Sequence, residues 1–83
     1  MIDMRVTTLD KLPIGKTGKI VSILHKGLTR RRLLDLGFVP GTLITAYFSS
    51  FTGDPVAYRI RGTTIALRRE DASKILINIE ENL

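Results

Sequence analysis

The spacing of glycine and proline constrains this chain most, because it divides the sequence into segments too short for long helices. Seven glycines and three prolines recur through 83 residues, and the stretches between them are rich in Ile, Val, Leu and Tyr. Short segments of β-branched and aromatic residues separated by turn formers are typical of β-strands. A chain of this length builds one modest core, so we predict a single, mainly β domain over residues 1–83.

The predicted strands alternate between an apolar face and a polar face. They span residues 19–25, 43–50, 56–60, 64–68 and 75–79. In the third, Val56, Tyr58 and Ile60 share one face, whereas Ala57, Arg59 and Arg61 share the opposite face. Short strands in so small a chain curl into a barrel, because closure removes exposed sheet edges. We therefore expect a small β-barrel with a basic outer face, and the sequence places the tight turn before the fourth strand at Gly62-Thr63.

One short helix is expected between the first two strands. Thr29 is its predicted N-cap, and Gly37 is the left-handed residue that ends it. Leu33 and Leu36 are expected to face the core. Single helical turns are predicted near residues 8–12 and 71–74.

Three consecutive arginines follow the predicted N-cap. Cations in a first helical turn oppose the helix macrodipole, at a cost of about 0.3–1 kcal/mol each. The Arg31–Asp35 pair has the less favourable order and recovers only about 0.2–0.5 kcal/mol. A local rule broken without compensation tends to mark a functional position. Arg30 and Arg31 are therefore predicted to bind a partner, and the alternative is a solvated basic face.

The aromatic residues divide into two predicted groups. Phe51 lies just before the turn Gly53-Asp54-Pro55, where an exposed aromatic serves as a contact residue. Tyr47, Phe48 and Tyr58 are expected to pack in the core or against the barrel. The predicted partner-binding residues are Arg30, Arg31, Phe51, Asp54, Arg59 and Arg61.

The composition limits the function classes. The net charge of +5 favours acidic partners such as nucleic acid, anionic lipid or an acidic protein surface. Neither a secretion signal nor a membrane-spanning run of about 20 apolar residues is found in the sequence. The absence of cysteine removes disulfides and thiolate ligands. We therefore expect a cytoplasmic protein without a transmembrane segment.

Catalytic, metal and cofactor sites are not expected. His25 is the only histidine, lacks the neighbours of a catalytic triad, and is predicted to lie at the surface at a strand end. Fe(II) prefers several imidazoles and carboxylates, so Glu70 with Asp71, or Glu80 with Glu81, offers at most weak binding of a divalent ion.

Gly15-Lys16-Thr17 resembles the end of a nucleotide-binding P-loop. That loop needs an earlier glycine, where this chain has Asp10, and a helix afterwards, where a strand is predicted. A solvated turn is the better interpretation.

Four motifs in one order carry a family resemblance. They are the segment from Arg30 to Gly41, with its arginines, Leu36-Gly37 and Pro40-Gly41; Gly53-Asp54-Pro55; Tyr58 to Gly62; and Ile65-Ala66-Leu67-Arg68. Together they cover nearly the whole chain, which resembles the FeoA family.

This resemblance implies an SH3-like β-barrel in the prokaryotic ferrous iron uptake system. It implies a cytoplasmic accessory that docks on FeoB, the membrane permease with a GTPase domain, and modulates Fe(II) transport at the inner face of the membrane. A repressor-type regulatory domain of the same fold is an alternative, although the chain leaves no room for a helix-turn-helix.

A nucleic-acid-binding barrel is the other alternative. The predicted basic face of Arg59, Arg61 and Arg68 permits it. Against it, that face lacks interleaved aromatic side chains on which bases could stack.

Overall fold

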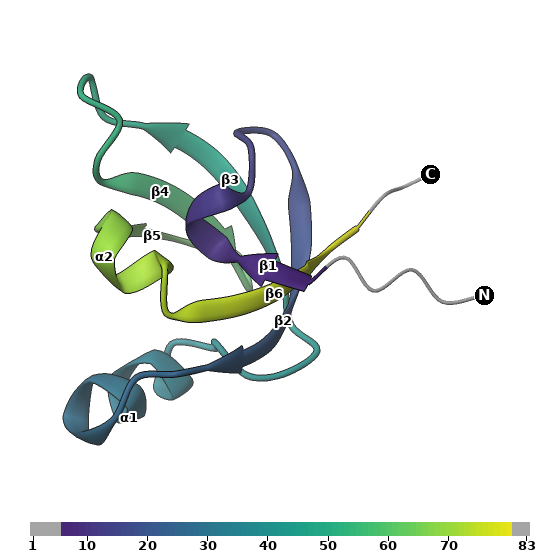
Figure 1. Ribbon diagram of the computed structural model, residues 1–83, viewed down its shortest axis with the longest axis vertical. Helices are drawn as coiled ribbons and strands as arrows, with labels where there is room; N and C mark the ends of the chain where they lie inside the picture. The colour runs from purple at the N-terminus through teal and green to yellow at the C-terminus, as the bar shows by residue number, and fades with distance from the viewer. Residues whose placement is uncertain (1–5, 81–83) are drawn as a thin grey trace.

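The computed structural model describes residues 6–80, which form one six-stranded antiparallel sheet with three short helical segments (Figure 1). The elements in chain order are β1 (Val6–Thr8), the 3-10 helix η1 (Leu9–Lys11), β2 (Thr17–Ile23), α1 (Gly27–Asp35), β3 (Leu43–Ser49), β4 (Val56–Ile60), β5 (Thr63–Leu67), α2 (Arg69–Ala72) and β6 (Ile75–Ile79). The mainly β prediction is confirmed. Within residues 6–80, no helix is long and apolar enough to cross a bilayer.

The strand order is β1-β6-β2-β3-β4-β5, so β1 and β5 are the two edges. The sequence analysis missed β1, because three residues directly before a helical turn are too few to show alternation; β1 pairs with β6. Irregular register between Ile20 and Ser22, and between Ala46 and Phe48, marks bulges that bend and twist the sheet. The sheet curls around its core but does not close, which leaves β5 with a neighbour on one side only.

The core lies inside the curl of the sheet. Alternating strand residues fill it, as predicted for Tyr58 and Ile60, and Ile75 and Ile77 of β6 fill it in the same way. Its largest fully buried side chains are Tyr58, Phe38, Leu9, Ile20, Ile44, Ile60, Ile75 and Ile77. This single cluster explains how a chain without cysteine holds its shape.

A Schellman motif ends α1. The amide of Phe38 donates to the Leu33 carbonyl and the amide of Gly37 donates to the Leu34 carbonyl, each at 3.0 Å. Gly37 has φ 109°, as predicted, and the motif's usual apolar contact has its members in Leu33 and Phe38, both buried. The motif fixes the direction in which the chain leaves α1.

The turn between β4 and β5 differs from the prediction by one residue. Ile60 pairs with Thr63, and the residues between them, Arg61 and Gly62, have φ 51° and 78°. Two positive φ values in a two-residue loop define a type I′ turn. Arg61 therefore lies in the turn and not on the outer face of β4. A Cβ atom at Gly37 would collide with the Arg61 side chain, so Arg61 packs on the end of α1.

Candidate functional site

The six predicted partner-binding residues do not form one site. Arg30 and Arg31 lie on α1, whereas Phe51 and Asp54 lie in the loop between β3 and β4. Figure 1 shows α1 and this loop at opposite ends of the long axis of the molecule. The predicted residues therefore belong to separate surfaces.

The arginines of α1 occupy different positions from those predicted. The helix begins at Gly27 with Lys26 as N-cap, because Gly27, at φ 64°, turns the chain sharply before Thr29 is reached. Arg32 consequently lies in the last turn, where a cation interacts favourably with the helix macrodipole. The predicted N-cap at Thr29 and the dipole argument built on it were wrong.

Arg30 and Arg31 have different surroundings. Arg30 donates from Nη1 to the Ile23 carbonyl at 3.2 Å, which ties α1 to the end of β2. Arg31 is exposed. Arg30 therefore positions the helix, and Arg31 is free to meet a partner.

Exposed aromatic side chains gather on the β3–β4 hairpin. We define the aromatic arm as Tyr47, Phe48, Phe51 and Arg59. The rings of Tyr47 and Phe48 have centroids 5.6 Å apart, and the Arg59 guanidinium carbon lies 5.8 Å from the centroid of Tyr47. This distance suits a cation–π contact. Phe51 at the loop is fully exposed, as predicted for a contact residue.

The prediction that Tyr47 and Phe48 are packed was wrong. They are 51% and 55% exposed, whereas Tyr58 is buried as expected. The bulge between Ala46 and Phe48 makes Tyr47 an extra residue in β3 and breaks the inward–outward alternation. Two consecutive aromatics are therefore left on the outside.

Asp54 connects the arm to α2. Its Oδ1 accepts a hydrogen bond from the Arg69 amide at 2.9 Å, while the N-cap residue of α2, Arg68, makes no capping bond through its side chain. A carboxylate is favourable at a helix N-terminus. The Thr52 hydroxyl donates to the Asp54 carbonyl at 3.1 Å. Asp54 therefore positions the loop that carries Phe51.

A groove that the sequence analysis missed lies between α1 and the edge formed by β5 and α2. One part has a volume of about 510 Å³, and its apolar lining comes from Leu28, Leu33, Leu36, Ile65, Ala66 and Leu67. A second part, of about 520 Å³, also borders Thr29 and Asp71 and reaches Leu24, His25, Lys26 and Lys74. We call the two parts together the α1 groove.

Leu28 and Leu36 are the signal that could have revealed the groove. They lie eight residues apart, on one face of α1, and are 88% and 39% exposed. The predicted core position of Leu36 was wrong, because this side chain lines the groove. Leu33 is buried as predicted.

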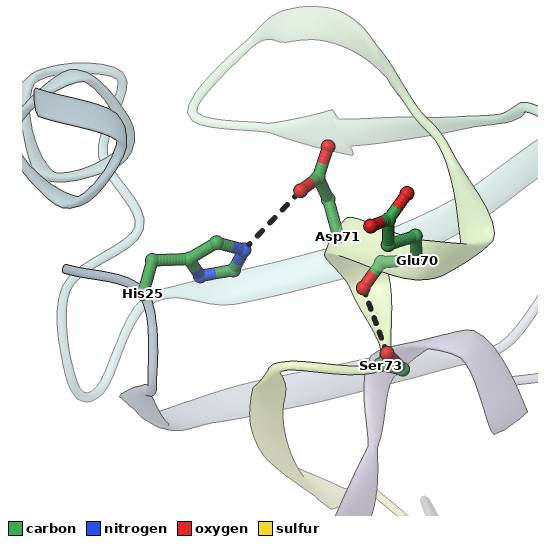
Figure 2. Close-up of polar contacts among 4 residues, drawn as sticks. All are labelled: His25, Glu70, Asp71 and Ser73. Carbon is green, nitrogen blue, oxygen red and sulfur yellow. Dashed lines mark hydrogen bonds and ion pairs between the residues drawn. The ribbon is translucent and has the colours of Figure 1, made fainter.

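His25 closes one end of the α1 groove. It was predicted at the surface but is buried, because β2 ends at Ile23 and the chain then turns back at Gly27. Its Nε2 lies 3.6 Å from Oδ1 of Asp71, and Figure 2 shows the ring reaching across to α2. Beside it, the Ser73 hydroxyl donates to the Glu70 carbonyl at 2.7 Å. Neither ring nitrogen of His25 has a hydrogen-bond partner in residues 6–80.

The acidic residues considered for weak metal binding do not gather into a larger cluster. Within the part of the chain that the structure describes, no three His, Cys, Asp or Glu side chains lie close enough to hold a metal ion. Glu70 and Asp71 are neighbours on α2. Glu80 follows β6, and Glu81 lies outside the described residues.

Tyr58 carries the one resolved pKa shift among the described residues. Burial raises the pKa of its phenol to about 12, and the nearby Asp10 carboxylate acts in the same direction. The phenol stays neutral in the folded chain because the interior disfavours its anion.

Comparison with known proteins identifies the family. The FeoA domain model matches residues 7–79. The Fe(2+) transport protein A/Fe(2+) transporter FeoB fusion protein of Porphyromonas gingivalis is 41% identical over 71 residues, which cover 86% of this chain and 8% of that much longer protein.

Solved structures agree in fold. A FeoA-like protein from Clostridium acetobutylicum has a TM-score of 0.84 at 30% identity and is matched over 98% of this chain and 94% of its own. Stenotrophomonas maltophilia FeoA, described as a prokaryotic SH3 domain protein and solved with zinc, has a TM-score of 0.76 at 26% identity over 87% of this chain and 89% of its own. The predicted SH3-like fold is confirmed, and the chain belongs to the FeoA family.

Proposed function

We propose that this chain is a cytoplasmic accessory of a ferrous iron uptake system, which binds the membrane permease FeoB and modulates Fe(II) transport. The observation that carries the proposal is the P. gingivalis relative, in which the FeoA and FeoB parts share one polypeptide. Covalent linkage keeps two modules at high effective concentration. A FeoA chain that is separate from its FeoB needs a binding surface to achieve the same proximity.

The chemistry of the chain favours binding over catalysis. Its single histidine is buried opposite Asp71 and makes no hydrogen bond to a nucleophile anywhere in residues 6–80. A general base must reach the proton that it removes. The exposed side chains, by contrast, are those that dominate protein interfaces.

The aromatic arm is the proposed docking surface for FeoB. Phe51 is fully exposed, and Tyr47 and Phe48 are half exposed beside Arg59. Aromatic and arginine side chains are enriched among the residues that dominate binding energy. The aromatics would enter apolar pockets on FeoB, and Arg59 would meet an acidic group there. Arg31 is a further contact from the other end of the molecule.

Capture by full-length FeoB in detergent tests this proposal. Phe48→Asp with Phe51→Asp should weaken capture by at least about tenfold, because both anchors are lost. Lys19→Glu is the matched control, since Lys19 is exposed on β2 and outside both surfaces. Arg31→Glu should have a smaller effect. Full capture of the double variant would show that the arm is not part of the interface. No capture of the wild type would refute the proposed binding of FeoB.

Single-stranded nucleic acid is a second candidate ligand of the same arm. The sequence analysis weighed against it because aromatics were not expected on the basic face, yet Tyr47 lies beside Arg59. Stacking platforms next to cations suit single strands. A labelled oligonucleotide that binds the wild type with steep salt dependence, but not Tyr47→Ala, would favour this function. Absence of binding at low salt would exclude it.

A further inference from the structure

We propose that the α1 groove is a second binding site, which takes an extended acidic peptide that adds as a strand to the free edge of β5. This site is separate from the aromatic arm. Three features of the described residues support it: an unpaired main-chain edge, an apolar wall opposite that edge, and a buried polar group without a partner.

The hairpin between β4 and β5 determines which main-chain groups are free. In a two-residue hairpin, the pair that flanks the turn, here Ile60 and Thr63, exchanges hydrogen bonds. Thr63, Ile65 and Leu67 therefore bond to β4. The N–H and C=O groups of Thr64 and Ala66 point to the open side, and no other main-chain hydrogen bond in residues 6–80 uses them. Such an edge is a template for another strand.

Helix α1 supplies the wall opposite this edge. Leu28 and Leu36 expose apolar surface there, and Ile65 and Leu67 line the groove from β5. Alternate side chains of an added strand would cover this surface. Residues of both α1 and β5 line the groove, so a chain added to the edge of β5 would lie against the helix. A second copy of this chain carries a net charge of +5, which suits the basic border of the groove less well than an acidic peptide does.

The charged groups around the groove select the peptide. Arg32, Lys26 and Lys74 border it, against the single carboxylate of Asp71 among the described lining residues. An excess of cations favours acidic side chains on the ligand. This preference distinguishes the site from a general apolar crevice.

At 3.6 Å, Oδ1 of Asp71 is too far from Nε2 of His25 for a hydrogen bond, which makes His25 an independent feature of the groove. Its side chain is 3% exposed, it borders the groove, and neither ring nitrogen has a hydrogen-bond partner in the part of the chain described. Buried polar groups are nearly always hydrogen-bonded. A peptide group at the end of the added strand would supply the bond.

Fluorescence anisotropy with the full chain tests the proposal. The probe is a labelled peptide of about six residues, the usual length of a strand, in which leucine alternates with glutamate. We expect saturable binding that Leu28→Asp weakens by at least about tenfold. Leu28 is 88% exposed, so this variant should keep its circular dichroism spectrum. Leu43→Asp is the matched control, since Leu43 is 53% exposed on β3 and lies outside the groove lining and the arm; this variant should bind as the wild type does.

Removal of the peptide's main-chain donors tests strand addition without changing the protein. The same peptide with N-methyl groups on its central amides should bind at least about tenfold more weakly. The bound unmethylated peptide should slow hydrogen exchange of the Thr64 and Ala66 amides.

Two results would overturn the proposal. They are no saturable binding up to about 1 mM peptide, the weak limit of useful affinity, and equal binding of the methylated peptide. Because FeoB is absent from this titration, its failure would leave the docking of FeoB on the arm intact.

Discussion

The aromatic arm and the α1 groove differ in the chemical groups that they present to a partner. The arm is a protruding hairpin whose contacts come from side chains, with Tyr47 beside Phe48 and Arg59. The groove is concave, and it presents the unpaired main-chain N–H and C=O groups of Thr64 and Ala66. Side-chain anchors select a partner by shape and composition, whereas a strand edge accepts many sequences. The same small fold can thus support one selective contact and one tolerant contact.

Each surface includes a polar contact to a neighbouring element from a residue that was predicted to bind a partner. Arg30 ties α1 to the Ile23 carbonyl, and Asp54 ties the arm to the Arg69 amide. These two side chains act by positioning elements that carry contact residues such as Phe51 and Leu28.

The largest expected effect on stability is at Gly37, which ends α1, the helix that lines the α1 groove. Gly37→Ala should destabilise the fold by about 2–3 kcal/mol, mainly because alanine at positive φ is strained, with a smaller part from displacing the Arg61 side chain that its Cβ would meet. Gly15→Ala is the matched control: Gly15 also has positive φ, but nothing lies near its Cβ position. It should cost only about 1–2 kcal/mol. Urea denaturation measures the free energy of unfolding of both variants. Equal losses would show that the Arg61 contact does not contribute to the cost at Gly37.

Alkaline pH should lower the free energy of unfolding through Tyr58, which pairs with Ala46 of β3 next to the arm. Its pKa is 10.0 in the unfolded chain and about 12 in the folded chain. Between these values the unfolded chain releases its proton more readily, so stability is complete below pH 10 and falls as the pH rises toward 12. Tyr58→Phe should lack this contribution. Urea midpoints at both ends of this interval measure it, and identical losses in wild type and variant would contradict it.

The hydrogen bond from Arg30 that holds α1 should contribute less to the free energy of unfolding than Gly37 does. Arg30→Met removes the hydrogen bond to the Ile23 carbonyl and should cost about 0.5–1.5 kcal/mol. Arg31→Met is the matched control and should be nearly neutral, because Arg31 is exposed like Arg30 but its side chain makes no hydrogen bond within residues 6–80. Urea denaturation of the pair measures the difference. If both variants were equally stable, Arg30 would not hold the helix.

The anchor of the arm should show the smallest effect on stability. Asp54→Ala removes the acceptor for the Arg69 amide and should cost about 0.5–1 kcal/mol, as the loss of an exposed cap does. Asp54→Asn keeps a side-chain oxygen and should recover most of the loss. Thermal unfolding of the two variants provides the comparison. A neutral alanine variant would mean that the loop is held by other contacts.

Features encoded by local periodicity and turn chemistry could be predicted from the sequence. In β4, Ala57 is buried although it was predicted on the outer face, and Val56 is only partly buried. Tyr58 and Ile60 are buried as the alternation predicted, and Gly37 ended α1 with positive φ as expected. Both depend on neighbours within a few residues. The exposed position of Phe51 followed in the same way from the turn after it.

Features that arise from tertiary geometry could not be predicted in this way. One extra residue in β3 exposes Tyr47 and Phe48, and nothing in the local pattern indicates where the bulge falls. His25 is buried because a turn brings it against α2, more than 40 residues later in the chain. The groove joins Leu28 to β5 across a similar sequence separation.

Simultaneous binding tests most directly whether the arm and the groove are separate sites. The labelled leucine–glutamate peptide would be titrated into the chain with and without saturating full-length FeoB. We predict the same Kd for the peptide in both titrations, since FeoB is proposed to occupy the arm and Arg31, which lie outside the groove lining, and to leave β5 open. Displacement of the peptide in proportion to bound FeoB would show that one surface serves both ligands, and would contradict this account.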